Sequence, residues 1–231
     1  MYKSTTSCGK VGLILHDIYR QVLGYKKNGI FVEVGANDGK IGSFTYNLAT
    51  LGWRGVYCEP VPEIYKLCVE NHKEHDNIIT LNVGCGCKKE DLTITVANTL
   101  STMDSQMLEM YKNATWAQST LKNSYETDIK IEKLDTLLEE NNIPCDFDIF
   151  VLDVEGYEEE VLKGFSLDFY KPKMVIIEIP DTHPDFIHNK DFLDKCKRIR
   201  NILNKNYKLI FNDIVDNVYI RLDMKIPVIS T

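Results

Sequence analysis

Glycines and carboxylates follow the first apolar strand of this sequence at a spacing that suits a nucleoside. Residues 31–39 read FVEVGANDG, and Glu59 lies twenty residues beyond the last of these glycines. Gly35 and Gly39 carry no Cβ, so the backbone there can turn sharply and approach a ligand. The amides that open the following helix can hold an anionic group. A carboxylate at the end of the second strand can accept hydrogen bonds from two ribose hydroxyls.

The middle of this turn helps to choose among the nucleoside cofactors. A dinucleotide fingerprint reads G-x-G-x-x-G, whereas Asn37 occupies the position of its second glycine. This departure favours S-adenosylmethionine, whose amino-acid tail replaces a pyrophosphate, over NAD or FAD. Two alternatives stay open at this point: a nicotinamide-dependent oxidoreductase, which Asn37 disfavours, and a non-catalytic scaffold with the same fold.

Each cofactor residue has an expected role. We expect Glu33 to meet the cofactor ammonium, because a glutamate in an apolar strand needs a partner. Ser43 either binds the cofactor carboxylate or caps its own helix. Asn82 and Val83 end the third strand and are placed to flank the adenine. The complete predicted set is Glu33, Gly35, Ala36, Asn37, Gly39, Ser43, Glu59, Pro60, Asn82 and Val83.

A second group of carboxylates follows two later strands. Asp153 and Glu155 end the fourth main strand and Glu178 ends the fifth, so all three should meet in one crevice. Because like charges repel, either one of them has a raised pKa and acts as a general base, or the group binds a cation. In the second case Asp153 and Glu178 would bind Mg²⁺, which acidifies a substrate hydroxyl. His183 is a further candidate base because histidines titrate near neutral pH, although it also fits a surface loop.

Strands and helices alternate along the chain, which predicts an α/β, doubly wound, mostly parallel sheet with one antiparallel strand near its end. A helix over residues 10–27 should cover the sheet, and a second helix, over residues 41–51, should follow the first strand. The polar, irregular residues 98–124 form an insertion that is either a lid over the substrate or a pair of surface helices. The expected strands cover residues 30–34, 55–59, 78–83, 92–96, 129–131, 148–154, 174–179, 208–211 and 218–222.

Composition excludes several classes of function. The chain has 231 residues and a net charge of -7, with a pI near 5.3, so it lacks the basic surface that nucleic acids require. No apolar run reaches the roughly twenty residues of a membrane span. The seven cysteines are scattered, and Cys85 and Cys87 are their only close pair, so we expect reduced thiols, a cytoplasmic protein and no zinc site. The oligomeric state is not indicated.

Three long motifs, in order, resemble those of the FkbM family of S-adenosylmethionine-dependent methyltransferases. They are FVEVGANDGKIGSFTYNLATLGWRGVYCEPVPEIYKL, IEKLDTLLEENNI and DIFVLDVEGYEEEVLKGF. The similarity runs from about Gly29 to Glu178, with a weaker echo in VDNVYIRLD. Many members have a lysine before the I-D-V-E-G run where this chain has Val151, but the aspartate and glutamate of the run are kept.

The resemblance implies a single class I methyltransferase domain over residues 1–231. Residues 1–28 would be its helical cover, and residues 98–124 its lid or substrate insertion. It also implies O-methylation of a sugar, a glycan or a related small-molecule hydroxyl, with S-adenosylmethionine as methyl donor.

Overall fold

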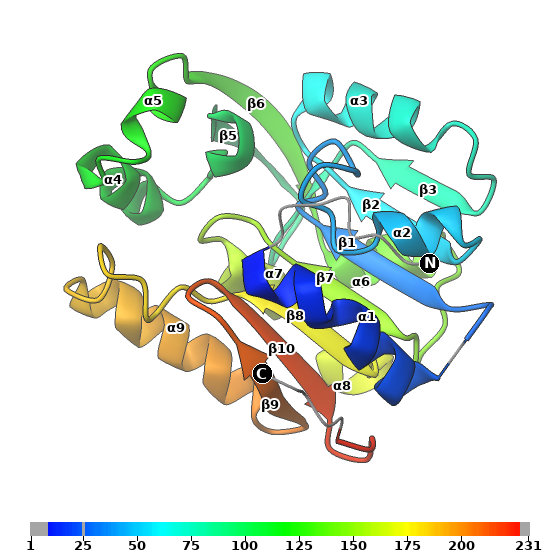
Figure 1. Cartoon of the computed structure of the whole chain (residues 1–231). Helices are drawn as coiled ribbons and strands as arrows, with labels where there is room; N and C mark the ends of the chain where they lie inside the picture. Colours follow the sequence, from blue (N-terminus) through cyan, green and yellow to red (C-terminus); the bar gives the residue numbers. More distant parts are fainter. Residues whose placement is uncertain (1–8, 25, 227–231) are drawn as a thin grey trace.

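Seven strands form the main sheet of the computed structural model, which describes residues 9–24 and 26–226. Their order across the sheet is β3-β2-β1-β7-β8-β10-β9 (Figure 1), and β10 alone runs antiparallel to the others. The predicted α/β sheet is confirmed, with the antiparallel strand lying between β8 and the edge strand β9. The strands are β1 (Ile30–Val34), β2 (Arg54–Cys58), β3 (Ile78–Leu81), β7 (Ile149–Leu152), β8 (Met174–Glu178), β9 (Tyr207–Asn212) and β10 (Asp216–Arg221).

Helices cover both faces of this sheet, because its central strands are apolar on both sides. In β1, Phe31 packs into the core beneath α1, α2 and α3, whereas Val32 and Val34 pack into the core beneath α6 to α9. In Figure 1, α1 lies in front of the sheet. The first group is α1 (Gly9–Leu23), α2 (Tyr46–Thr50) and α3 (Pro62–His72); the second is α6 (Leu134–Glu140), α7 (Glu158–Lys163), α8 (Leu167–Tyr170) and α9 (Lys190–Leu203).

Two predicted helices differ from the observed ones. The N-terminal helix ends at Leu23 rather than residue 27, just before Gly24, whose φ is 66°. Residues 1–8 of the predicted cover, residue 25 and residues 227–231 lie outside the described residues. The second predicted helix, 41–51, is confined to Tyr46–Thr50, since turns occupy the chain before it. Among the described helices, none combines the length and the apolar character that crossing a bilayer requires.

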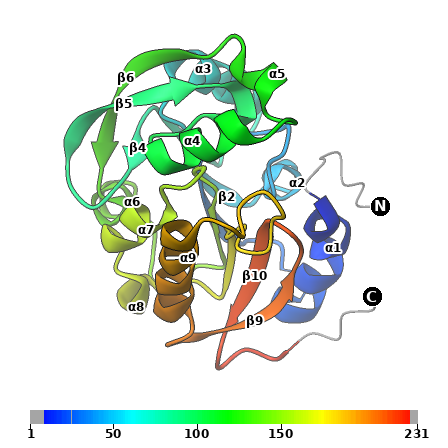
Figure 2. The ribbon, with the colours of Figure 1, turned by 90° about the vertical axis from the view of Figure 1, so that its left-hand side faces the viewer.

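A second, three-stranded sheet carries the insertion. Its strands β4 (Gly84–Cys85), β5 (Glu90–Val96) and β6 (Tyr125–Glu132) lie in the order β4-β6-β5, with β5 and β6 antiparallel. The insertion joins β5 to β6 through η1 (Asn98–Leu100), α4 (Ser105–Asn113) and α5 (Gln118–Leu121). Figure 2 shows β5, β6 and α4 at one end of the main sheet. The sequence predicted parts of both strands but not their pairing into one long ribbon.

The insertion is packed into the protein core. Met107, Tyr111 and Ala117 are almost completely buried and belong to the same apolar cluster as Leu152 of β7. Burial of a side chain as large as that of Met107 contributes about 1.5–3 kcal/mol to stability. The insertion therefore has a fixed position over the ends of the central strands.

Candidate active site

A cavity of about 590 Å³ opens at the carboxyl ends of β1, β2, β7 and β8. Parallel strands of a doubly wound sheet present their ligand sites at this edge, and the volume suits a small molecule or cofactor. The lining includes eleven of the predicted site residues: Glu33, Gly35, Ala36, Asn37, Ser43, Glu59, Pro60, Val83, Asp153, Glu155 and Glu178.

The turn after β1 is held against its two neighbouring strands. The amides of Gly35 and Ala36 both donate to the carbonyl of Cys58, each at 3.1 Å. Gly35 has φ 83°, and a Cβ placed on it would lie 1.6 Å from the carbonyl oxygen of Asp153. Glycine is needed here because the end of β7 leaves no space for a side chain, and the same turn forms one wall of the cavity.

Glu59 lies at the cavity where a ribose-binding carboxylate was expected. One of its oxygens accepts a hydrogen bond from the Asn37 amide at 3.0 Å, and the other accepts one from the Val61 amide at 2.9 Å. Burial raises the pKa of Glu59 to about 7, although both amides act in the opposite direction. A carboxylate offers about four acceptor positions, so two remain for the hydroxyls of a ribose. The free acceptor positions of Glu59 thus fit the ribose hydroxyls of S-adenosylmethionine.

Glu33 has its partners within the chain. Its carboxylate accepts hydrogen bonds from the hydroxyls of Ser43, at 2.9 Å, and of Thr45, and from the Phe44 amide at 3.3 Å. Burial raises the pKa of Glu33 to about 7. The Ser43 hydroxyl also accepts from the amides of Thr45 and Tyr46 at the start of α2. Ser43 therefore supports the start of α2, and it also lines the cavity.

Three predicted residues are not part of the cavity lining. Gly39 packs against α3, where a Cβ would lie 2.7 Å from both Cys68 and His72. Asn82 donates through its side-chain amide to the carbonyls of Glu59 and Pro60, at 3.0 and 2.9 Å, and so supports the end of β2. His183 lies in the loop after β8, with its ring stacked on Phe186 at 4.4 Å between centroids.

Asp153, Glu155 and Glu178, which we call the acidic cluster, meet as predicted. One carboxylate oxygen from each lies within 4.8 Å of the others. Burial raises the pKa of all three, and neighbouring carboxylates add to the shift for Glu155 and Glu178. Oε2 of Glu178 is the one buried side-chain nitrogen or oxygen of the described chain without a hydrogen-bond partner.

Asp216 is a cavity residue that the sequence reasoning missed. It opens β10 directly opposite Glu178, and burial together with the charge of Asp153 raises its pKa to about 8. Because β10 is antiparallel, its first residue lies at the edge where the parallel strands end. The predicted antiparallel strand should therefore have indicated a cavity residue at its start, but the predicted strand began only at residue 218.

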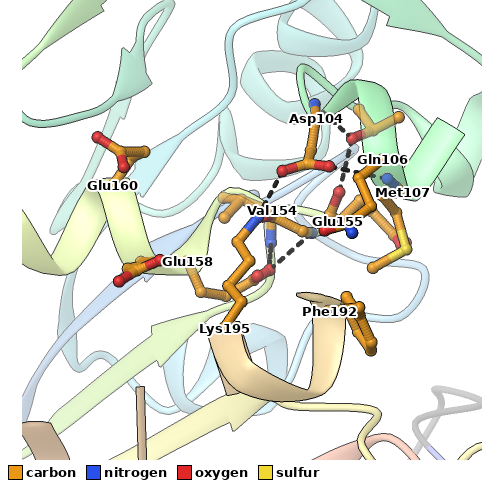
Figure 3. A network of polar contacts seen from close by, with 12 residues as sticks. Asp104, Gln106, Met107, Val154, Glu155, Glu158, Glu160, Phe192 and Lys195 are labelled. Carbon is orange, nitrogen blue, oxygen red and sulfur yellow. Dashed lines mark hydrogen bonds and ion pairs between the residues drawn. The ribbon is translucent and has the colours of Figure 1, made fainter. Parts of the chain in front are cut away.

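The turn that carries Asp153 and Glu155 is held by Glu158 of α7 and by Lys195 of α9 (Figure 3). Glu158 accepts hydrogen bonds from the amides of Val154 and Gly156, both at 3.1 Å. From α9, Lys195 donates to the Gly156 carbonyl and to the carboxylate of Asp104, which caps α4. These contacts hold the backbone that carries Asp153 and Glu155.

The insertion contacts both the acidic cluster and the loop after β8. The Tyr111 hydroxyl donates to the Glu155 carboxylate, and the Thr102 hydroxyl donates to the Glu155 carbonyl at 2.6 Å. The Trp116 indole donates to Asp185 at 2.8 Å. Five residues of the insertion line the cavity: Asn98, Thr99, Ser101, Met103 and Trp116.

The strand order, the glycine turn and the acidic tip of β2 are those of a class I methyltransferase fold. The family model described as the methyltransferase FkbM domain matches residues 33–209. The chain therefore belongs to the FkbM methyltransferase family and is an S-adenosylmethionine-dependent methyltransferase. This membership decides against the nicotinamide-dependent oxidoreductase.

Solved structures with a similar fold are more distant. They include a putative rRNA methylase from Clostridium thermocellum (10% identity over 96% of this chain and 99% of the other, TM-score 0.49). A second is a fibrillarin pre-rRNA processing protein from Methanococcus jannaschii (15% identity over 85% of this chain and 67% of the other, TM-score 0.45). A third is the O-methyltransferase TomG from Streptomyces achromogenes (12% identity over 90% of this chain and 77% of the other, TM-score 0.46). No curated protein matches the chain significantly.

Proposed function

We propose that the enzyme transfers the methyl group of S-adenosylmethionine to a hydroxyl of a sugar, a glycan or a related small molecule. The observation that carries this proposal is the continuity of the cavity, which joins the nucleoside-type site at Glu59 to the acidic cluster. A methyltransferase for hydroxyl groups needs both parts, because the acceptor loses a proton as it gains a methyl group.

On the cofactor side, Glu59 would hold the ribose hydroxyls, and the backbone of Gly35 and Ala36 would lie along the methionine portion. Val83 and Pro60, which also line the cavity, would flank the adenine. The bound cofactor supplies an electrophilic methyl group. Fixing the acceptor oxygen in line with that group is a matter of geometry, and alignment of this kind lowers a barrier by as much as about 7–11 kcal/mol.

On the acceptor side, the acidic cluster would take the hydroxyl proton as the new O–C bond forms and the C–S bond breaks. Carboxylates with raised pKa values are stronger bases than ordinary ones and suit general base catalysis near neutral pH. Glu178 is the best placed of the three, because its Oε2 has no partner while Glu155 already accepts from Tyr111. His183 is a weaker candidate, since it does not line the cavity.

The same carboxylates would also suit Mg²⁺. Their oxygens are the ligand type that this ion prefers, and Glu178 offers an unpartnered one. A cation there would lower the pKa of the acceptor hydroxyl. Dialysis against EDTA separates the two mechanisms: loss of activity that Mg²⁺ restores indicates the metal, and unchanged activity indicates a carboxylate base.

The test is transfer of radiolabelled methyl groups to a panel of glycans and small sugars, comparing wild type with Glu178→Gln. We expect at least one methylated acceptor, with kcat reduced by about 10²–10⁴-fold in the variant. Binding of S-adenosylhomocysteine without methyl transfer to any acceptor in the panel would contradict the proposed acceptor class.

A further inference from the structure

The insertion places one exposed aromatic side chain in the cavity. Trp116 lines the cavity together with the acidic cluster, although 47% of its surface is exposed. The other tryptophan, Trp53, is only 3% exposed. An exposed tryptophan that also lines a polar cavity is a common means of binding a ligand with both an apolar face and polar edges.

Trp116 is held in a defined orientation before any acceptor binds. Its indole nitrogen donates to Asp185 at 2.8 Å, so the ring is fixed to the loop after β8. Its ring also contacts Tyr111, with centroids 5.8 Å apart and planes at 74°, and His183, with centroids 5.6 Å apart. A ring fixed in this way loses little conformational entropy when a ligand packs on it.

The chemistry around Trp116 is that of a site for cyclic polyols. A sugar ring presents C–H groups on its faces and hydroxyls at its edges. Exposed polar residues of the insertion, Asn98 and Thr99, line the same cavity, and beyond them the acidic cluster offers acceptors for hydroxyl hydrogens. We propose that Trp116 is the stacking platform for a pyranose ring of the acceptor, which makes it a substrate-binding residue that selects sugars over acyclic polyols.

This inference rests on the proposed function, and it has a readout besides activity. In a Trp53→Phe background Trp116 is the only tryptophan of the chain, so its emission reports directly on what packs against it. The probes are methyl β-D-glucopyranoside, methyl β-D-galactopyranoside and methyl α-D-mannopyranoside, each with saturating S-adenosylhomocysteine. The acyclic polyol D-glucitol is the control, because it offers similar hydroxyls without a ring face.

We expect at least one pyranoside to shift or quench the emission saturably at millimolar concentration, and D-glucitol to have no such effect. No response to any of the three pyranosides, or an equal response to D-glucitol, overturns the inference. Absence of S-adenosylhomocysteine binding overturns the proposed function as well, so the two failures are distinguishable.

A kinetic comparison gives an independent test. Trp116→Leu should raise the KM for a pyranoside acceptor at least tenfold while the affinity for S-adenosylhomocysteine stays unchanged. Trp116→Tyr should have a KM close to that of wild type. The matched control is Tyr125→Leu, because Tyr125 is also exposed (48%) but does not line the cavity. An unchanged KM in Trp116→Leu, or an equal rise in Tyr125→Leu, contradicts the role of the platform.

Discussion

Replacing Gly35 by alanine tests the contact that joins the cofactor turn to the acidic cluster. The new Cβ would lie 1.6 Å from the carbonyl oxygen of Asp153, in a backbone with φ 83°. The backbone conformation alone disfavours alanine by about 1–2 kcal/mol, and forcing atoms into a packed site adds about 1–3 kcal/mol. We therefore expect Gly35→Ala to lose about 2–5 kcal/mol of unfolding free energy.

Gly52→Ala is the matched control for this variant. Gly52 has φ 84°, but no atom lies within 4 Å of the position of its Cβ, so it should lose only about 1–2 kcal/mol. Urea denaturation followed by circular dichroism gives both values, and titration calorimetry gives their affinities for S-adenosylhomocysteine. Only Gly35→Ala should bind more weakly, because relief of the clash moves the turn. Equal losses of stability in both variants would refute the close approach of β1 and β7.

Two further predictions concern buried charge. Lys195→Met removes the ammonium that binds Asp104 and the Gly156 carbonyl, so it should lose about 3 kcal/mol of unfolding free energy. The control Lys197→Met, at an exposed position, should lose at most about 0.5 kcal/mol. Equal losses in the two variants would show that the contacts of Lys195 do not stabilise the fold. Burial raises the pKa of Glu33 from 4.5 to about 7, so the folded protein binds this proton more tightly than the unfolded chain. The stability from Glu33 is then complete below pH 4.5 and lost as the pH rises to about 7. Glu33→Gln should reduce the loss of stability between pH 5 and pH 7.5 by up to about 3 kcal/mol relative to wild type, whereas the exposed Glu74→Gln should leave that loss unchanged. A loss in Glu33→Gln as large as that of wild type would show that this carboxyl ionises normally.

The main sheet was predictable because its signals are local. The apolar run of β7, Ile149–Leu152, is buried on both faces, as a central parallel strand must be. The ribbon of β5 and β6 was not predictable in full, because its two strands pair across the whole insertion. Local patterns indicate extended chain there but do not indicate the partner.

The acidic residues at strand ends were predictable for the same reason, since a strand's end fixes the position of its last side chain. Contacts between segments that are distant in the sequence could not be predicted in the same way. Glu33 needed a partner, but only the fold shows that Ser43 and Thr45 supply it. Asp216 required the start of an antiparallel strand, and the role of Lys195 required its contact with Asp104, the N-cap residue of α4.

Titration calorimetry with S-adenosylhomocysteine tests the nucleoside site most directly. Wild type should bind at micromolar concentration, and Glu59→Gln should bind about 10- to 100-fold more weakly, as expected for losing a charged hydrogen-bond acceptor worth about 1.5–3 kcal/mol. The exposed Glu74→Gln should bind like wild type. Equal affinity in Glu59→Gln and wild type would contradict the assignment of this cavity to the methyl donor.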